Sequence, residues 1–169
     1  GPWNQNKYTK NKKGHPKGSI FWGSSGPLRN GKGSCYEGGY RLPCIVRWPG
    51  KVPAGRESDA VLATIDFMPT FAKLSDFKIP ADRVIDGIDQ TDLLLGNSKK
   101  GRETFYFDRA GIRKGKWKYL KAKAHFYGYA REDDRPLEEE LYDLENDLGE
   151  TTNLAKKHPK VVAELRKLT

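Results

Sequence analysis

The first forty residues contain many glycines and few aliphatic side chains, and this limits the possible fold more than any other feature of the chain. Eight glycines fall between Gly14 and Gly39, among Asn, Ser and Lys residues. Glycine and small polar residues mark turns and loops rather than packed helices or strands. A loop of this length in a compact domain is usually either functional or disordered. The aromatic side chains within it favour partial order in a larger protein: Trp3, Tyr8, Phe21, Trp22 and Tyr36.

Regular elements are expected only after this loop. Pro43–Trp48 is a short apolar run with β-branched residues, which predicts a buried strand. Asp66–Leu74 predicts a helix with Asp66 as its N-cap and apolar side chains along one side. Leu93–Leu95 predicts a short buried turn before a glycine. These elements lie in residues 1–101, which we treat as one part of the chain.

Residues 102–169 have the pattern of an antiparallel sheet followed by one helix. The predicted strands are Thr104–Phe107, two strands within Ile112–Leu120 around a tight turn at Lys114-Gly115, His125–Tyr129 and Glu140–Leu144. Pro159–Leu168 predicts an amphipathic helix with proline in its first turn. This part is therefore expected to be a small α+β subdomain.

One predicted strand shows a regular alternation of aromatic and charged side chains. Trp117 and Tyr119 alternate with Lys116 and Lys118. Side chains in a strand point alternately to its two faces. We therefore expect a half-buried strand, with the aromatic residues toward the core and the lysines on the other face.

The positive charge of the chain is concentrated in its first third. The net charge is +9, and residues 1–60 contain 11 Lys and Arg against three Asp and Glu. Residues 61–169 contain 20 against 19. Such a basic segment attracts phosphate, sulfate or polyanions. The sequence contains no nucleic-acid-binding motif and no apolar run of about 18 residues that would span a membrane.

The cysteines and histidines do not form a recognisable metal or disulfide pattern. Cys35 and Cys44 lie nine positions apart, without metal-ligand spacing, and are expected to be buried small side chains. His15, His125 and His158 are scattered. We therefore predict no metal ligand within this chain.

Several segments together carry a family resemblance. Leu28–Pro43 (LRNGKGSCYEGGYRLP) resembles the L-R-x-G-K-G-x-x-Y/W-E-G-G-x-R-x-P segment of the formylglycine-dependent (type I) sulfatases, or arylsulfatases. Four further segments resemble blocks of the same family in the same order: Arg47–Gly55, Thr64–Phe71, Asp86–Asp89 and Glu140–Leu154. Leu148 stands where the last block usually has proline. The chain is therefore similar to the C-terminal portion of a sulfatase.

The resemblance implies a role for Lys32. In sulfatases the lysine of G-K-G contacts the sulfate group, and here that lysine is Lys32. His15 lies in the preceding insert and is expected to contact polar groups of the substrate near the mouth of the site. Glu37 is expected to accept backbone N–H groups or to pair with Arg41, and Gly38-Gly39 to form a turn with positive φ.

The resemblance also implies parts that this chain lacks. The parent fold is the alkaline-phosphatase-like α/β sandwich, of which residues 1–101 would be the C-terminal end, followed by the α+β subdomain at 102–169. The Asp and Asn of the calcium-binding D-N-G motif would stand just before Gly1, and the C-x-P-S-R motif that yields formylglycine would lie further upstream. We therefore expect the N-terminal part of the sulfatase as partner, a sulfated small molecule or glycan as substrate, and no activity from this chain alone.

A different function class stays open at this point. The basic residues within 1–60 would also suit a standalone module that binds polyanions such as sulfated glycans. Binding of that kind weakens steeply with salt and does not depend on a single lysine. A degenerate sulfatase fragment with a structural role is a third possibility.

Overall fold

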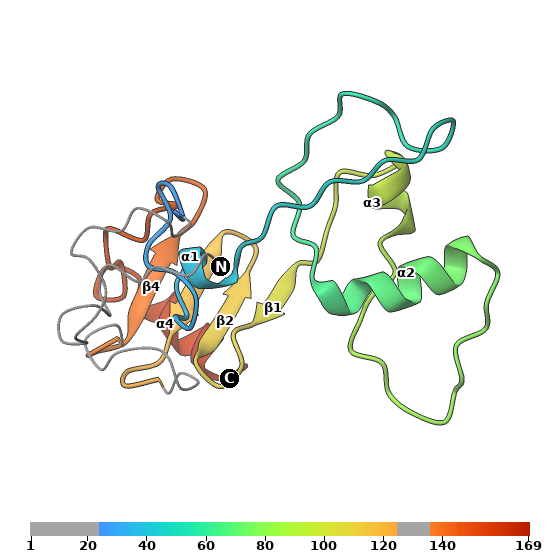
Figure 1. Cartoon of the computed structure of the whole chain (residues 1–169). Coiled ribbons are helices and arrows are strands. Elements are labelled where there is room, and N and C mark those ends of the chain that lie inside the picture. The colour runs from blue at the N-terminus through green and yellow to red at the C-terminus, as the bar shows by residue number, and fades with distance from the viewer. Residues whose placement is uncertain (1–23, 125–135) are drawn as a thin grey trace, which may run out of the picture. The chain divides into compact units, whose positions relative to one another are not determined.

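The computed structural model describes residues 24–124 and 136–169. It divides into two compact units (Figure 1). The first contains the described residues up to Pro43 together with Tyr106–Thr169, and the second is Cys44–Phe105. The expected domain boundary at residue 101 refers to the whole parent protein and stays a prediction. Within the described residues, no helix is both long enough and apolar enough to cross a membrane.

The first unit is built around a four-stranded sheet in the order β1-β2-β3-β4. Strand β1 begins at Thr104, two residues before the start of this unit's second segment at Tyr106. The strands are β1 Thr104–Tyr106, β2 Gly111–Lys114, β3 Trp117–Leu120 and β4 Glu140–Asp143. The pairs β2–β3 and β3–β4 are antiparallel. Gly115, with φ of 56°, forms the tight turn between β2 and β3. The predicted antiparallel sheet is confirmed, while His125–Tyr129 lies outside the described residues.

The C-terminal helix covers one face of this sheet. Helix α4 is Pro159–Arg166, close to the predicted Pro159–Leu168. Its Val162 and Leu165 pack with residues of β2, β3 and β4 in one hydrophobic core, namely Ile112, Tyr119 and Leu141. The terminal helix is therefore amphipathic, as its sequence predicts.

The opposite face of β3 is also covered, contrary to the expectation for its lysines. Lys118 has no exposed side-chain surface. The segment that carries helix α1, Glu37–Tyr40, lies against it, and the Lys118 ammonium reaches Glu37. The alternation with Trp117 and Tyr119 is present, but both faces of the strand are buried. The sequence prediction was wrong here because the covering segment is about eighty positions away.

The second unit contains two short helices. Helix α2 is Phe67–Leu74, preceded by a 3-10 turn, and α3 is Thr91–Leu95. Helix α2 agrees with the helix predicted at Asp66–Leu74. Helix α3 lies where only a short buried turn, Leu93–Leu95, was predicted. Asp66 stands at the N-cap of α2, but its side chain makes no capping hydrogen bond. Its carboxylate instead accepts hydrogen bonds from neighbouring segments.

The predicted buried strand at Pro43–Trp48 is not found, and this prediction was wrong. The segment is extended without strand pairing, and the Ile45 side chain is 93% exposed. A strand needs a neighbouring strand to bond its backbone groups, and none of the described strands pairs with this segment.

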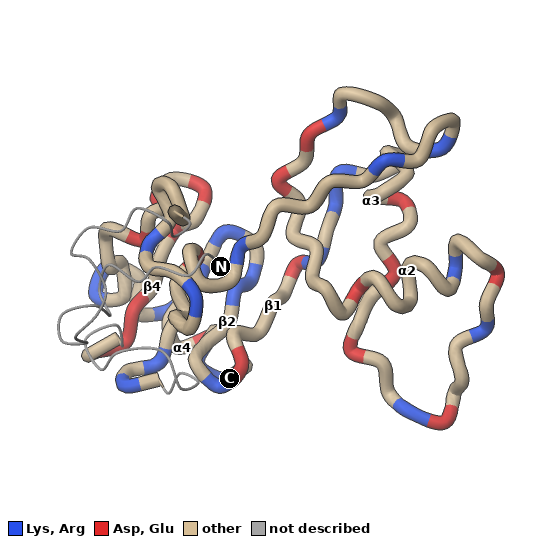
Figure 2. The backbone as a smooth tube through the Cα atoms, viewed as in Figure 1, with Lys and Arg blue, Asp and Glu red and all other residues tan. Residues whose placement is uncertain are grey.

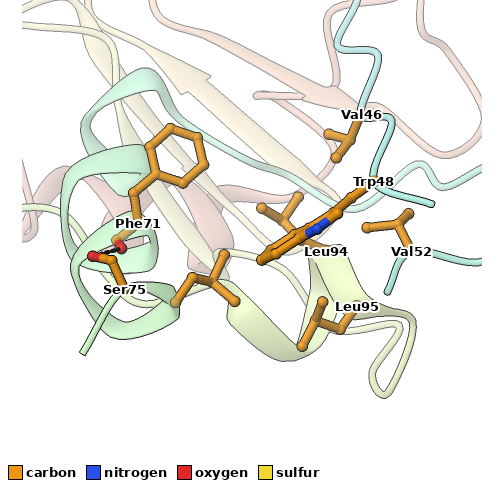
Figure 3. A pocket seen from close by; sticks show the side chains of 8 residues that line it. Val46, Trp48, Val52, Phe71, Ser75, Leu94 and Leu95 are labelled. Carbon is orange, nitrogen blue, oxygen red and sulfur yellow. Dashed lines mark hydrogen bonds between the residues drawn. The ribbon is translucent and has the colours of Figure 1, made fainter. Parts of the chain in front are cut away.

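An open apolar hollow of about 380 Å³ lies in the second unit. Trp48 and Phe71 contribute aromatic side chains to it (Figure 3). Val46, Val52, Leu94 and Leu95 complete most of its lining (Figure 3). Two apolar side chains of α2, Phe71 and Leu74, thus line this open hollow.

Candidate functional site

The G-K-G sequence forms a tight turn, residues 31–33, with Lys32 at its centre. Gly33 has φ of 88°, a conformation that strongly favours glycine. The N–H of Ser34 donates to the Gly31 carbonyl at 3.1 Å and closes the turn. Lys32 is exposed, whereas residues 34–38 directly after it are buried. The turn therefore exposes Lys32, while the segment that follows the turn is buried.

The two glycines after the turn belong to helix α1, so the predicted positive φ at Gly38-Gly39 was wrong. Their role is close packing. A Cβ on Gly38 would lie 2.2 Å from the carbonyl oxygen of Asn30. A Cβ on Gly39 would lie 2.2 Å from the carbonyl oxygen of Ser34. The Gly38 N–H also donates to the Arg29 carbonyl at 2.9 Å, so α1 is packed directly against the backbone around the turn.

Glu37 anchors the side of the turn that leads into α1. Its carboxylate pairs with Arg41, as predicted. It also accepts from the buried Lys118 ammonium at 2.8 Å, and its backbone N–H donates to the Glu150 carboxylate at 2.7 Å. Burial alone would raise the pKa of Glu37, but Lys118 and Arg41 outweigh it and lower the pKa. Glu37 is therefore held as a carboxylate.

Arg29 anchors the other side of the turn. Its guanidinium lies over the Tyr36 ring, 3.7 Å from the ring centroid. It donates to the Tyr142 hydroxyl at 2.7 Å and to the Glu150 carbonyl at 3.1 Å. The Tyr36 hydroxyl in turn donates to Glu140 at 3.0 Å. A cation stacked on an aromatic ring and bonded at its edge has little freedom to move.

Sequence reasoning gave no role in this arrangement to Arg29, Lys118 or Glu150. The alternation predicts Lys118 on an exposed strand face, and Glu150 has no assigned role within the family segment Glu140–Leu154. That segment was the available signal, because a glutamate in a second family segment is a candidate partner for the turn. Its distance in sequence from the turn hid the contact.

The other predicted residues have mixed outcomes. His15 lies outside the described residues. Cys35 is fully buried, and burial raises the pKa of its thiol, so it is unsuited as a nucleophile. Cys44 is exposed, contrary to the expected burial. Within the part of the chain that the structure describes, no three His, Cys, Asp or Glu side chains group to hold a metal ion.

Residues 31–168 match the family model described as N-sulphoglucosamine sulphohydrolase, C-terminal. The chain belongs to this sulfatase family. The match begins at the G-K-G turn and runs through the sheet and α4, so it includes the turn and most of its supporting residues. The resemblance of the sequence to the C-terminal portion of a sulfatase is thereby confirmed.

Two curated sulfatases and one solved structure show how far the similarity extends. An N-acetylgalactosamine-6-O-sulfatase of Bacteroides thetaiotaomicron is 37% identical over 150 residues, which cover 85% of this chain and 29% of that protein. Human arylsulfatase A is 34% identical over an alignment of 177 positions, gaps included, that covers 86% of this chain and 33% of that protein. The chain thus spans about a third or less of these sulfatases.

The solved structure comes from work on the metabolism of glycosaminoglycans by Bacteroides thetaiotaomicron. It superposes with a TM-score of 0.74 at 36% identity, covering 85% of this chain and 31% of the other. The fold of this chain is therefore the C-terminal part of the alkaline-phosphatase-like sulfatase fold, with a small antiparallel sheet and a terminal helix.

Proposed function

We propose that this chain contributes Lys32 to the hydrolysis of a sulfate monoester, as the C-terminal part of a sulfatase. The observation that carries the proposal is the presentation of Lys32. It is exposed on a tight turn, while the residues that follow it are buried, and Glu37 among them is bonded to Lys118 of β3 and to Glu150. A flexible surface lysine would not need such support.

The chemistry of an ammonium group suits this role. It is a compact cation that neutralises one sulfate oxygen and stabilises negative charge that develops as the S–O bond breaks. Because the turn is fixed before the substrate arrives, little reorganisation is needed when this charge develops.

Calcium and formylglycine, which the family resemblance implies, do not fit the residues described. These offer no grouped metal ligands, and neither cysteine lies in a C-x-P-S-R motif. We therefore assign both to the remainder of the sulfatase, which we propose as the partner of this chain. No step of the reaction is derived through them.

We propose a sulfated sugar as the substrate. The Bacteroides relative is named for N-acetylgalactosamine 6-O-sulfate chemistry, and the similar solved structure comes from work on glycosaminoglycans. Arylsulfatase A supports an aryl sulfate as the alternative. In the same site His15 would contact polar groups of the sugar.

The test uses the natural polypeptide that carries this chain, with N-acetylgalactosamine 6-sulfate and an aryl sulfate as substrates. Lys32→Ala is expected to lower kcat/KM by about 10²- to 10³-fold, as does the loss of one oxyanion-stabilising donor. Lys51→Ala, which removes another exposed lysine, is the control and is expected to leave kcat/KM unchanged. The isolated chain is expected to hydrolyse neither substrate.

The polyanion-binding module is the competing outcome of this experiment. Five of the lysines in the basic first third lie outside the described residues. In the described part, acidic and basic residues are interspersed along both units (Figure 2). Binding of heparin-like chains that falls steeply with salt and is unaffected by Lys32→Ala, together with no sulfatase activity of the natural polypeptide, would replace our proposal with this one.

A further inference from the structure

Both sides of the G-K-G turn are bonded to one residue, Glu150. On the side before the turn, Arg29 donates to the backbone carbonyl of Glu150 at 3.1 Å. On the side after it, the Glu37 N–H donates to the Glu150 carboxylate at 2.7 Å. Glu150 is 1% exposed, so water does not compete for these bonds. One residue in the last twenty of the chain therefore fixes the two flanks of Lys32.

The carboxylate of Glu150 is itself held by a buried cation. The Lys118 ammonium lies 2.8 Å from a carboxylate oxygen of Glu150 and 2.8 Å from one of Glu37. All three side chains are at most 3% exposed. The same ammonium lies 4.1 Å from the centre of the Phe107 ring. A buried charge that loses its partner is strongly unfavourable, so these three groups fix one another's positions.

The backbone at Glu150 shows that the position is constrained. Its φ is 53°, in the left-handed region that a residue with a Cβ enters at a cost. Asp147 holds this loop, because its carbonyl accepts the Glu150 N–H at 3.2 Å and its carboxylate accepts the next two backbone N–H groups. A glycine would adopt this backbone more easily, but it would lack the carboxylate that contacts the Glu37 N–H and the Lys118 ammonium.

We propose that Glu150 is a positioning residue for Lys32, acting through Arg29 and Glu37, with Lys118 as its counter-charge. This inference rests on the proposed role of Lys32 at the sulfate group. Glu150 does not touch the substrate. It fixes the position from which Lys32 contacts the sulfate group. A displacement of the Lys32 ammonium by about 1 Å can lower the rate by about 10²-fold.

A double-mutant cycle on the natural polypeptide tests this, with an aryl sulfate as the probe. Glu150→Gln is expected to lower kcat/KM by about 10- to 100-fold, with most of the loss in kcat, as for Lys32→Ala. In a Lys32→Ala background the same change is expected to lower it by less than about twofold, because a misplaced turn no longer matters. The inference would be overturned if Glu150→Gln lowered kcat/KM equally in both backgrounds. It would also be overturned if Glu150→Gln did not lower kcat/KM in the protein that keeps Lys32.

Three further variants separate positioning from folding. Glu150→Asp keeps the charge but withdraws the carboxylate by one methylene, and it repeats the cycle if Glu150→Gln does not fold. Glu150→Gly relaxes the backbone but removes the carboxylate, so the inference expects the activity loss of Glu150→Gln; full activity would overturn it. Glu145→Gln removes an exposed glutamate from the same loop and is expected to change nothing. The single variant Lys32→Ala tests the proposed function, which fails if this variant keeps full activity. The double-mutant cycle tests the separate inference about Glu150.

Discussion

Asp66 shows how a single buried carboxylate organises the second unit. Its side chain is completely buried and pairs with the guanidinium of Arg102. It also accepts the backbone N–H groups of Ala63 and Ile88, each at 2.9 Å. The start of α2, the segment before α3 and the segment leading into β1 are thus joined at one residue. The sequence marked Asp66 only as a helix cap, which is a smaller role than the one it has.

The charge of Asp66 should make the second unit sensitive to acid. Burial alone would raise the pKa of Asp66, but the hydrogen bonds from Arg102 and from the N–H groups of Ile88 and Ala63 outweigh it and lower the pKa. Because the folded-state pKa is below the unfolded one, this carboxylate stabilises the fold above about pH 4. That contribution is lost as the pH falls through the folded-state pKa.

We therefore expect Asp66→Asn to lower the free energy of unfolding of the chain by about 2 to 4 kcal/mol near pH 7. The difference from the wild type should shrink as the pH falls from about 4 through the lowered folded-state pKa of Asp66, where the wild-type carboxylate becomes protonated. Urea unfolding at a series of pH values measures both. Asp82→Asn is the matched control, because Asp82 pairs with Arg83 on the surface and its loss should not be measurable. A pH-independent difference would contradict this account.

At the scale of elements, α1 and the G-K-G turn behave as one packed piece. Gly38 is where they touch, and a Cβ there would lie 2.2 Å from the Asn30 carbonyl oxygen and 2.5 Å from that of Arg29. Both neighbours are backbone atoms, which cannot move aside as a flexible side chain does. Any side chain at this position must therefore push the helix away from the turn.

Gly38→Ala is accordingly expected to destabilise the chain by about 2 to 4 kcal/mol, because it forces a backbone shift in a packed region. Gly26→Ala is the control within the same loop. Gly26 has φ of 59°, but no atom lies within 4 Å of the position that its Cβ would take, so only the left-handed conformation costs, about 1 kcal/mol. Denaturant unfolding compares the two variants. Equal losses would mean that close packing at Gly38 is not the cause.

The elements that sequence reasoning predicted are those with a local signal. Helices α2 and α4 follow from apolar spacing and terminal residues, and the β2–β3 hairpin follows from its alternation and from Gly115. Two features depend on distant partners and were missed. The burial of Lys118 requires α1. A strand at Pro43–Trp48 requires a partner strand, and none of the described strands pairs with it. For the site, the motif identified the turn, while its support from Glu150 depends on tertiary contact.

At the scale of the whole molecule, the second unit leaves apolar surface uncovered. Ile45 is 93% exposed, and Phe71, which lines the apolar hollow, is 55% exposed. An exposed apolar patch marks an interaction site or a tendency to associate, and the hollow is the candidate patch. The remainder of the sulfatase is the partner that we propose for it.

Without that partner, the isolated chain is expected to self-associate as its concentration rises. Phe71→Asp should suppress this, because it places a charge in the apolar hollow (Figure 3). Leu137→Asp adds the same charge at a residue that is 82% exposed in the other unit, and it should leave association unchanged. Light scattering after size-exclusion chromatography measures the mass of each variant. Suppression by both variants would indicate a general charge effect instead.

The long separation in sequence between the G-K-G turn and Glu150, which supports it, has a consequence for synthesis of the protein. Glu37 and Glu150 are 113 positions apart. At about 5 to 20 residues per second, a ribosome needs roughly 5 to 25 seconds to make the intervening chain. Throughout that interval Lys32 has left or is leaving the ribosome without its anchor. A product that ends before Glu150 would thus carry every residue of the G-K-G motif and still lack the bonds from Glu150 to Arg29 and Glu37. The turn that we propose for sulfate contact is therefore fully supported only once Glu150 has been translated.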